Sequence, residues 1–137
     1  MDMHNQLFKL EFEVRDYECD MEGIVNNAEY MHYLEHTRHA FLHHKGFEFA
    51  ALIQKGINLV VIRSEVNYVY PLRSGDKFYA TAGIERISKL RFGFAQAIFR
   101  LPDDKPILKA TIFGTSLNAE GQPKYFNELE GLFLPQT

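Results

Sequence analysis

The sequence contains a single cysteine, Cys19, and no tryptophan. One cysteine cannot form a disulfide within the chain, so its cysteine content gives no sign of an oxidising compartment. No apolar run approaches the roughly 20 residues that a membrane-spanning helix needs. Residues 1–6 also lack the basic and apolar regions of a secretory signal. We therefore expect a cytoplasmic protein that has no membrane partner.

A strong charge of either sign is also missing, since the formal net charge is -3. This balance gives no electrostatic reason to expect a polyanion as partner, so nucleic-acid binding is not predicted. What the chain does have is an ordinary globular composition, with 46% hydrophobic residues in 137 positions. That length suits one domain with its own core. Since no repeat or long linker divides it, we expect a single domain over residues 1–137.

The first part of the chain predicts a strand followed by a long helix. Apolar residues alternate with charged ones along the strand, which is typical of a half-buried strand. The apolar set is Phe8, Leu10, Phe12 and Val14. A polar stretch over residues 16–27 then leads into a helical pattern over residues 28–45, where Gly46 is the expected stop. The apolar arc of this helix is wider than the stripe of a surface helix, so other elements must cover it.

The second half of the chain predicts four further strands, because apolar residues alternate within it. These strands fall at residues 57–70, 78–84, 92–98 and 108–112. The short connectors between them are too short for parallel crossovers, so the strands must be antiparallel. The predicted fold is α+β, a five-stranded antiparallel sheet wrapped around one long helix. Its open sheet edge favours a homo-oligomer.

The segment before the helix carries the residues with chemical potential. Asn26 stands where a helix N-cap is expected, and Glu29 three residues later completes an approximate capping box. The N–H of Asn27 is then left without an intrahelical partner at the positive end of the helix dipole. Gly23 allows a tight turn that brings Asp20 towards this N–H. A carboxylate beside a vacant N–H is the minimum equipment for acyl transfer, although an Asp near a Gly is also ordinary turn chemistry.

The run Asp-Met-Glu-Gly-Ile-Val-Asn-Asn-Ala-Glu-Tyr, residues 20–30, resembles the active-site signature of the 4-hydroxybenzoyl-CoA thioesterase family. Its flanks are similar to bacterial members and to plant acyl-lipid thioesterases. The resemblance implies a hotdog fold that assembles as a homodimer or homotetramer. It also implies hydrolysis of an acyl-CoA or acyl-carrier-protein thioester to free acid and thiol. No metal or organic cofactor is implied apart from the coenzyme A of the substrate.

By position, the resemblance assigns Asp20 as general base or nucleophile and the Asn27 N–H as the group that polarises the thioester carbonyl. Many relatives carry His at position 27, so Asn27 makes a His-assisted proton transfer doubtful here, and Asn26 or Asn27 can instead place water. Tyr30 matches a residue that lines the acyl pocket. Tyr68 and Phe94 are further candidates for lining it.

Basic residues surround a tight turn in the second half of the chain: Arg86, Lys89 and Arg91. They are either a solvated turn or, as similar positions in the family suggest, contacts for the coenzyme A phosphates. A stripe of His32, His36, His39 and His43 has a spacing that can bind zinc, but no Cys or acidic cluster completes a site, and a solvated helix face or subunit contact is expected. Cys19 is expected to be buried and inert.

Two rival functions remain open. The first is a hotdog protein that binds acyl-CoA without turnover. The second is a hotdog dehydratase, which is disfavoured because the acidic group precedes the helix and no loop His followed by Pro-Gly is present.

Overall fold

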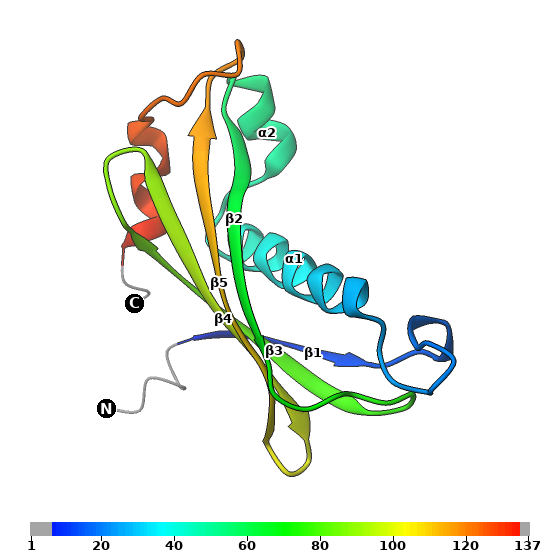
Figure 1. Ribbon diagram of the computed structural model, residues 1–137. Helices are drawn as coiled ribbons and strands as arrows, with labels where there is room; N and C mark the ends of the chain where they lie inside the picture. The colour runs from blue at the N-terminus through cyan, green and yellow to red at the C-terminus, as the bar shows by residue number, and fades with distance from the viewer. Residues whose placement is uncertain (1–6, 135–137) are drawn as a thin grey trace.

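The computed structural model describes residues 7–134 and contains one sheet, with helices α1 and α2 on the same side of it (Figure 1). The elements in chain order are β1 (Phe8–Glu13), η2 (Asp16–Glu18), α1 (Asn27–His44), α2 (Phe49–Gln54), β2 (Asn58–Tyr68), β3 (Lys77–Arg86), β4 (Arg91–Leu101), β5 (Lys105–Leu117) and η3 (Asn127–Phe133). The predicted order of strand, long helix and four strands is confirmed. Sequence reasoning missed the short elements α2 and η3.

All strand pairings in the sheet are antiparallel, and the strand order is β1-β3-β4-β5-β2. The hairpin strands β3, β4 and β5 therefore form the centre, while β1 and β2 lie at the two edges. A register shift between Val61 and Arg63 places a bulge in β2, and bulges of this kind bend a strand and increase its twist. The α+β class and the antiparallel sheet are thus as predicted.

The core lies between α1 and the sheet. Leu34 of α1, Phe78 of β3 and Ile98 of β4 are all fully buried, and burying one such side chain contributes about 1.5–3 kcal/mol. The predicted apolar arc of α1 faces this core, but one charged residue, Arg38, is buried with it. The helix ends at His44, and Gly46 follows with φ 89°, a conformation that glycine adopts readily.

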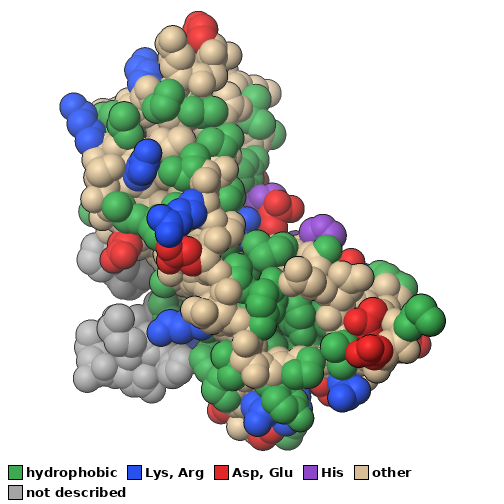
Figure 2. Space-filling model, in the orientation of Figure 1, with side chains coloured by type: hydrophobic (Ala, Val, Ile, Leu, Met, Phe, Trp, Pro, Cys, Tyr) green, Lys and Arg blue, Asp and Glu red, His purple; other side chains and the backbone are tan. Residues whose placement is uncertain are grey.

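The edge strand β2 is exposed along its middle. Val61, Ile62 and Tyr68 keep 52%, 44% and 51% of their surface accessible. Figure 2 shows hydrophobic side chains gathered on the face of the molecule that carries β2. An unpaired, apolar edge of this kind is a template for pairing with another chain. Within residues 7–134, no helix has the length and apolar character needed to cross a bilayer.

Candidate active site

The loop between η2 and α1 is a small, well-tied turn. The N–H of Asp20 donates to the Ile24 carbonyl at 2.8 Å, and the Gly23 N–H donates to the Asp20 carbonyl at 3.0 Å. Gly23 has φ 81°, which a residue with a side chain adopts only with strain. Cys19 pairs with Val25 across the turn as an isolated bridge. The glycine therefore serves the turn, as its position in the sequence suggested.

Asp20 has one carboxylate oxygen held by its own loop. Its Oδ1 accepts hydrogen bonds from the N–H of Glu22 at 2.9 Å and from the N–H of Ile24 at 3.4 Å. This is the geometry by which Asp side chains stabilise turns. The other oxygen, Oδ2, has no hydrogen-bond partner within residues 7–134, and the side chain is exposed. The carboxylate is thus oriented through one oxygen and free at the other.

The start of α1 leaves one amide unused. Asn26 is the N-cap, and its Oδ1 accepts from the Ala28 N–H at 3.1 Å. Asn27, the first residue of the helix, has an N–H with no acceptor within the described part of the chain. The Glu29 side chain does not complete a capping box; its Oε2 lies 3.2 Å from Nδ1 of His32. The helix therefore presents a vacant N–H at its positive end.

One pocket of about 440 Å³ brings several of these groups together. We call it the Asp20 pocket. Asp20, Asn27, Tyr30 and Tyr68 all line it, so four residues singled out from sequence share one hollow. The remaining lining residues are Ile24, Val25, Val69, Tyr70 and Pro71. The sequence did not predict that the segment after β2 lines this pocket. The feature that could have indicated it is the aromatic run that ends at Pro71.

Two tyrosines of α1 hold the loop in place. The hydroxyl of Tyr30 accepts a hydrogen bond from the Leu72 N–H at 2.9 Å, while the Leu72 carbonyl accepts from the Val25 N–H at 2.9 Å. Leu72 is fully buried and thus ties the loop to the helix; it was not predicted. The hydroxyl of Tyr33 donates to Oε1 of Glu18 at 2.9 Å. Burial, together with this hydrogen bond to the carboxylate, raises the pKa of Tyr33 above its ordinary value.

The basic turn between β3 and β4 lies beside η3, away from the loop that precedes α1 (Figure 1). The Arg86 guanidinium is engaged within its own chain, where it donates to the carbonyls of Ser88 and Lys89 and to Glu130 at 3.0 Å. It also lies 4.2 Å from the centre of the Phe133 ring. Neither Arg86 nor Lys89 nor Arg91 lines the Asp20 pocket of the same chain. For these residues to contact its phosphates as predicted, coenzyme A must extend from the Asp20 pocket to another part of the surface.

Other residues noted in the sequence are distributed as follows. Phe94 is buried and lines a different hollow, not the Asp20 pocket. Cys19 is half-buried, and burial raises the pKa of its thiol. The histidines of α1 are not simply solvated: the rings of His36 and His39 pack against Phe12 and Phe49 respectively. Within residues 7–134 no three His, Cys, Asp or Glu side chains are grouped as a metal site would require.

Comparisons with known proteins find relatives that are described as thioesterases. The chain is 38% identical over 119 residues, 87% of its length, to a chloroplastic acyl-acyl carrier protein thioesterase of Arabidopsis thaliana. It spans 63% of that relative and 54% of a second Arabidopsis protein of the same description, less than two thirds of either.

Solved structures show the same fold. A hypothetical protein from Aquifex aeolicus superposes with a TM-score of 0.83 at 28% identity, covering 91% of this chain and 98% of that one. A 1,4-dihydroxy-2-naphthoyl-CoA thioesterase from Synechocystis gives a TM-score of 0.83 at 16% identity, with 89% and 90% coverage. The hotdog fold is therefore confirmed. The family model described as the thioesterase-like superfamily matches residues 14–128. The chain belongs to the thioesterase-like superfamily.

Proposed function

We propose that this protein hydrolyses an acyl thioester of coenzyme A or of acyl carrier protein. The observation that carries the proposal is that one pocket is lined both by Asp20, whose carboxylate has a free oxygen, and by Asn27, whose N–H has no acceptor in the described chain. A positioned carboxylate can take a proton from water, and a fixed N–H can stabilise the oxygen of a tetrahedral intermediate. The names of the Arabidopsis relatives support a thioester as substrate.

In this mechanism the thioester carbonyl oxygen accepts a hydrogen bond from the Asn27 N–H. Asp20, through its free Oδ2, removes a proton from a water molecule whose oxygen attacks the carbonyl carbon. The carbon–sulfur bond then breaks, and the thiolate leaves with a proton returned from Asp20, which gives free acid and thiol. A direct attack by Oδ2, with an anhydride that water later hydrolyses, uses the same atoms. Each carboxylate role is consistent with an oxygen that has no other partner.

The Asp20 pocket is open beside the exposed end of β2, where Tyr68, Val69 and Tyr70 form part of its wall. A second copy of the chain that pairs with the β2 edge would cover this opening and exclude water from the acyl group. We therefore propose that the active form is a homodimer, alone or within a tetramer.

The alternative functions make different predictions. No histidine lines the Asp20 pocket within the described chain, which gives a dehydratase mechanism no imidazole there. An acyl-CoA-binding protein without turnover would bind thioesters but release no thiol.

The test is a free-thiol release assay over acyl-CoAs from acetyl to palmitoyl and over aromatic esters, on the natural protein and on Asp20→Asn. The Asn side chain keeps an oxygen that can accept from the Glu22 N–H, so the loop is preserved. We expect kcat to fall by at least about 100-fold in the variant. Equal rates for both proteins on every good substrate would remove Asp20 from the mechanism.

A further inference from the structure

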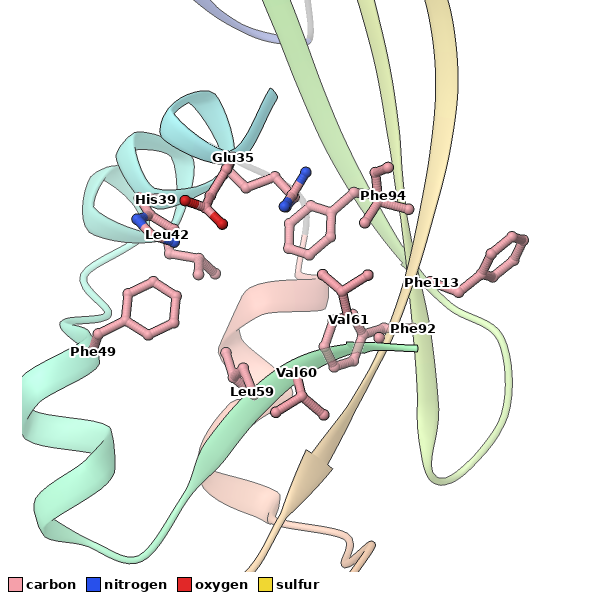
Figure 3. Close-up of a pocket in the computed structure, with 13 residues that line it drawn as sticks. Glu35, His39, Leu42, Phe49, Leu59, Val60, Val61, Phe92, Phe94 and Phe113 are labelled. Carbon is pink, nitrogen blue, oxygen red and sulfur yellow. The ribbon is translucent and has the colours of Figure 1, made fainter. Parts of the chain in front are cut away.

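A second hollow, of about 320 Å³, lies along the C-terminal half of α1 and shares no residue with the Asp20 pocket. We call it the Arg38 cavity. Figure 3 shows Phe49 of α2 and Leu59 of β2 reaching towards it from two sides. Part of its apolar wall is buried, since Leu42, Phe92, Phe94 and Ile112 are all at most 5% exposed, while Val61 at its β2 side is 52% exposed. The volume is at the lower end of the range for small-ligand sites.

The cavity contains a buried cation. Arg38 lines it and is only 8% exposed. One amino group, Nη1, donates to Oε1 of Gln96 at 3.1 Å, and the Gln96 amide in turn donates to the Leu34 carbonyl at 3.1 Å. These bonds fix the orientation of the guanidinium, which lies 6.0 Å from the centre of the Phe94 ring. Arg38 is therefore held in place by neutral groups.

No carboxylate oxygen of residues 7–134 lies within 4.0 Å of the Arg38 guanidinium. Burial lowers the pKa of Arg38, yet an arginine side chain stays protonated in proteins. The charge of Glu35 acts in the opposite direction and raises the pKa of Arg38, but Glu35 forms no close ion pair with it. A buried cation without a close ion pair is unfavourable, and buried cations are normally paired. The fold thus maintains, beside an apolar wall, a fixed positive charge that a bound anion would neutralise.

Two other polar groups face the cavity. Figure 3 shows Glu35 and His39 on α1 on the same side of it. Burial lowers the pKa of His39, which disfavours a second cation beside Arg38. Glu35 is exposed to solvent at the rim. Its negative charge repels an incoming anion and therefore lowers the affinity of the cavity for it.

We propose that the Arg38 cavity binds an aliphatic monocarboxylate, with the carboxylate on Arg38 and the tail against Leu42, Phe49 and Phe92. A guanidinium matches a carboxylate in a two-point hydrogen bond, and the apolar wall favours a hydrocarbon over a sugar or a nucleotide. The inference requires neither Asp20 nor Asn27. The inference rests on the proposed function only for the identity of the ligand. With that function, the ligand is the free acid that hydrolysis releases, and the cavity is a binding site for the product.

The test is calorimetric titration of the purified protein with octanoate and with octan-1-ol, which share a tail and differ in the head group. We expect the natural protein to bind octanoate more tightly, and Arg38→Met to lose about tenfold or more of octanoate affinity while it keeps that for octan-1-ol. Glu35→Gln, which removes the opposing charge, should strengthen octanoate binding. An octanoate affinity no higher than that of octan-1-ol, or a preference that survives in Arg38→Met, overturns the proposal.

A second variant keeps the test decisive if Arg38→Met does not fold. Leu59→Trp fills the cavity from β2 and leaves Arg38 and Gln96 intact, so both probes should lose binding. Unchanged binding of octanoate in Leu59→Trp would place the ligand elsewhere. Asp20→Asn should bind octanoate as the natural protein does, which separates failure of this site from failure of the proposed hydrolysis.

Discussion

The backbone N–H of Leu72 donates a hydrogen bond to the Tyr30 hydroxyl across 2.9 Å, and this contact links α1 to the segment that follows β2. Leu72 is fully buried, so its N–H cannot turn to water if the hydroxyl is removed. Tyr30→Phe should therefore lower the free energy of unfolding by about 1–3 kcal/mol, the usual effect of a buried donor left unsatisfied. Urea unfolding followed by circular dichroism measures it.

Tyr68→Phe is the matched control, because Tyr68 lies against the Tyr30 ring and is 51% exposed. Its hydroxyl can meet solvent, so we expect a change within about 0.5 kcal/mol. If the two variants lose equal stability, the Tyr30 hydroxyl does not hold the loop.

Asn27→Pro tests the helix N–H directly. Proline removes the N–H and is tolerated in the first turn of a helix. The preceding residue, Asn26, has φ -64° and ψ 140°, which a residue before proline also adopts. Stability should therefore change little, while kcat for thiol release should fall by about 10²–10³, as expected for loss of one oxyanion donor. Steady-state kinetics with the best acyl-CoA substrate gives the result.

Asn27→Ala is the companion variant, since it removes the side chain and keeps the N–H. Its kcat should remain within a few-fold of the natural protein. Should the alanine variant lose as much activity as the proline variant, the side-chain amide rather than the backbone N–H would be the group that matters.

Asn26→Ala addresses the cap and not the reaction. The Asn26 side chain accepts from the Ala28 N–H, and loss of such a cap costs about 0.5–2 kcal/mol. The melting temperature should fall, and thiol release at 25 °C should persist. A variant as stable as the natural protein would show that the cap contributes nothing.

Ile62→Lys probes the β2 edge as a subunit contact. Ile62 is 44% exposed at the bulge of the edge strand, where a lysine disfavours pairing between chains. We expect a smaller mass by light scattering after size exclusion and a loss of thiol release. Leu90→Lys is the control, because Leu90 is also an exposed apolar residue, at 39%, but lies in the turn after β3 and is not part of β2. Dissociation of both variants, or of neither, would contradict a contact at β2.

The regular elements were predictable because their patterns are strong. Alternation along β1 matches its burial, in which Phe8, Leu10 and Phe12 are the less exposed residues. The short helix α2 was missed because six residues give too little periodicity to recognise. Burial of Arg38 was also missed. Its partner Gln96 is 58 residues away in the sequence, and no local pattern reports such a distant contact.

The candidate site likewise has residues that the sequence could predict and residues that it could not. Asp20, Gly23, Asn26 and Asn27 lie close together in the chain, so turn and capping rules could place them. Leu72 and the wall after β2 reach the site only through the sheet topology. For Arg86, the sequence showed the positive charge but not its salt-bridge partner, the Glu130 carboxylate of η3.

Asp20 has both a structural role and a proposed chemical role, because Oδ1 stabilises the turn, while the residue lines the Asp20 pocket and its Oδ2 has no partner in the described chain. Replacement by alanine would disturb the loop conformation and the reaction together, and its inactivity would have two explanations. The same coupling applies to natural substitutions: a residue that replaces Asp20 and ends catalysis must also leave the turn stable. An inactive descendant of this protein is therefore more easily reached through Asn than through any residue that lacks a side-chain oxygen.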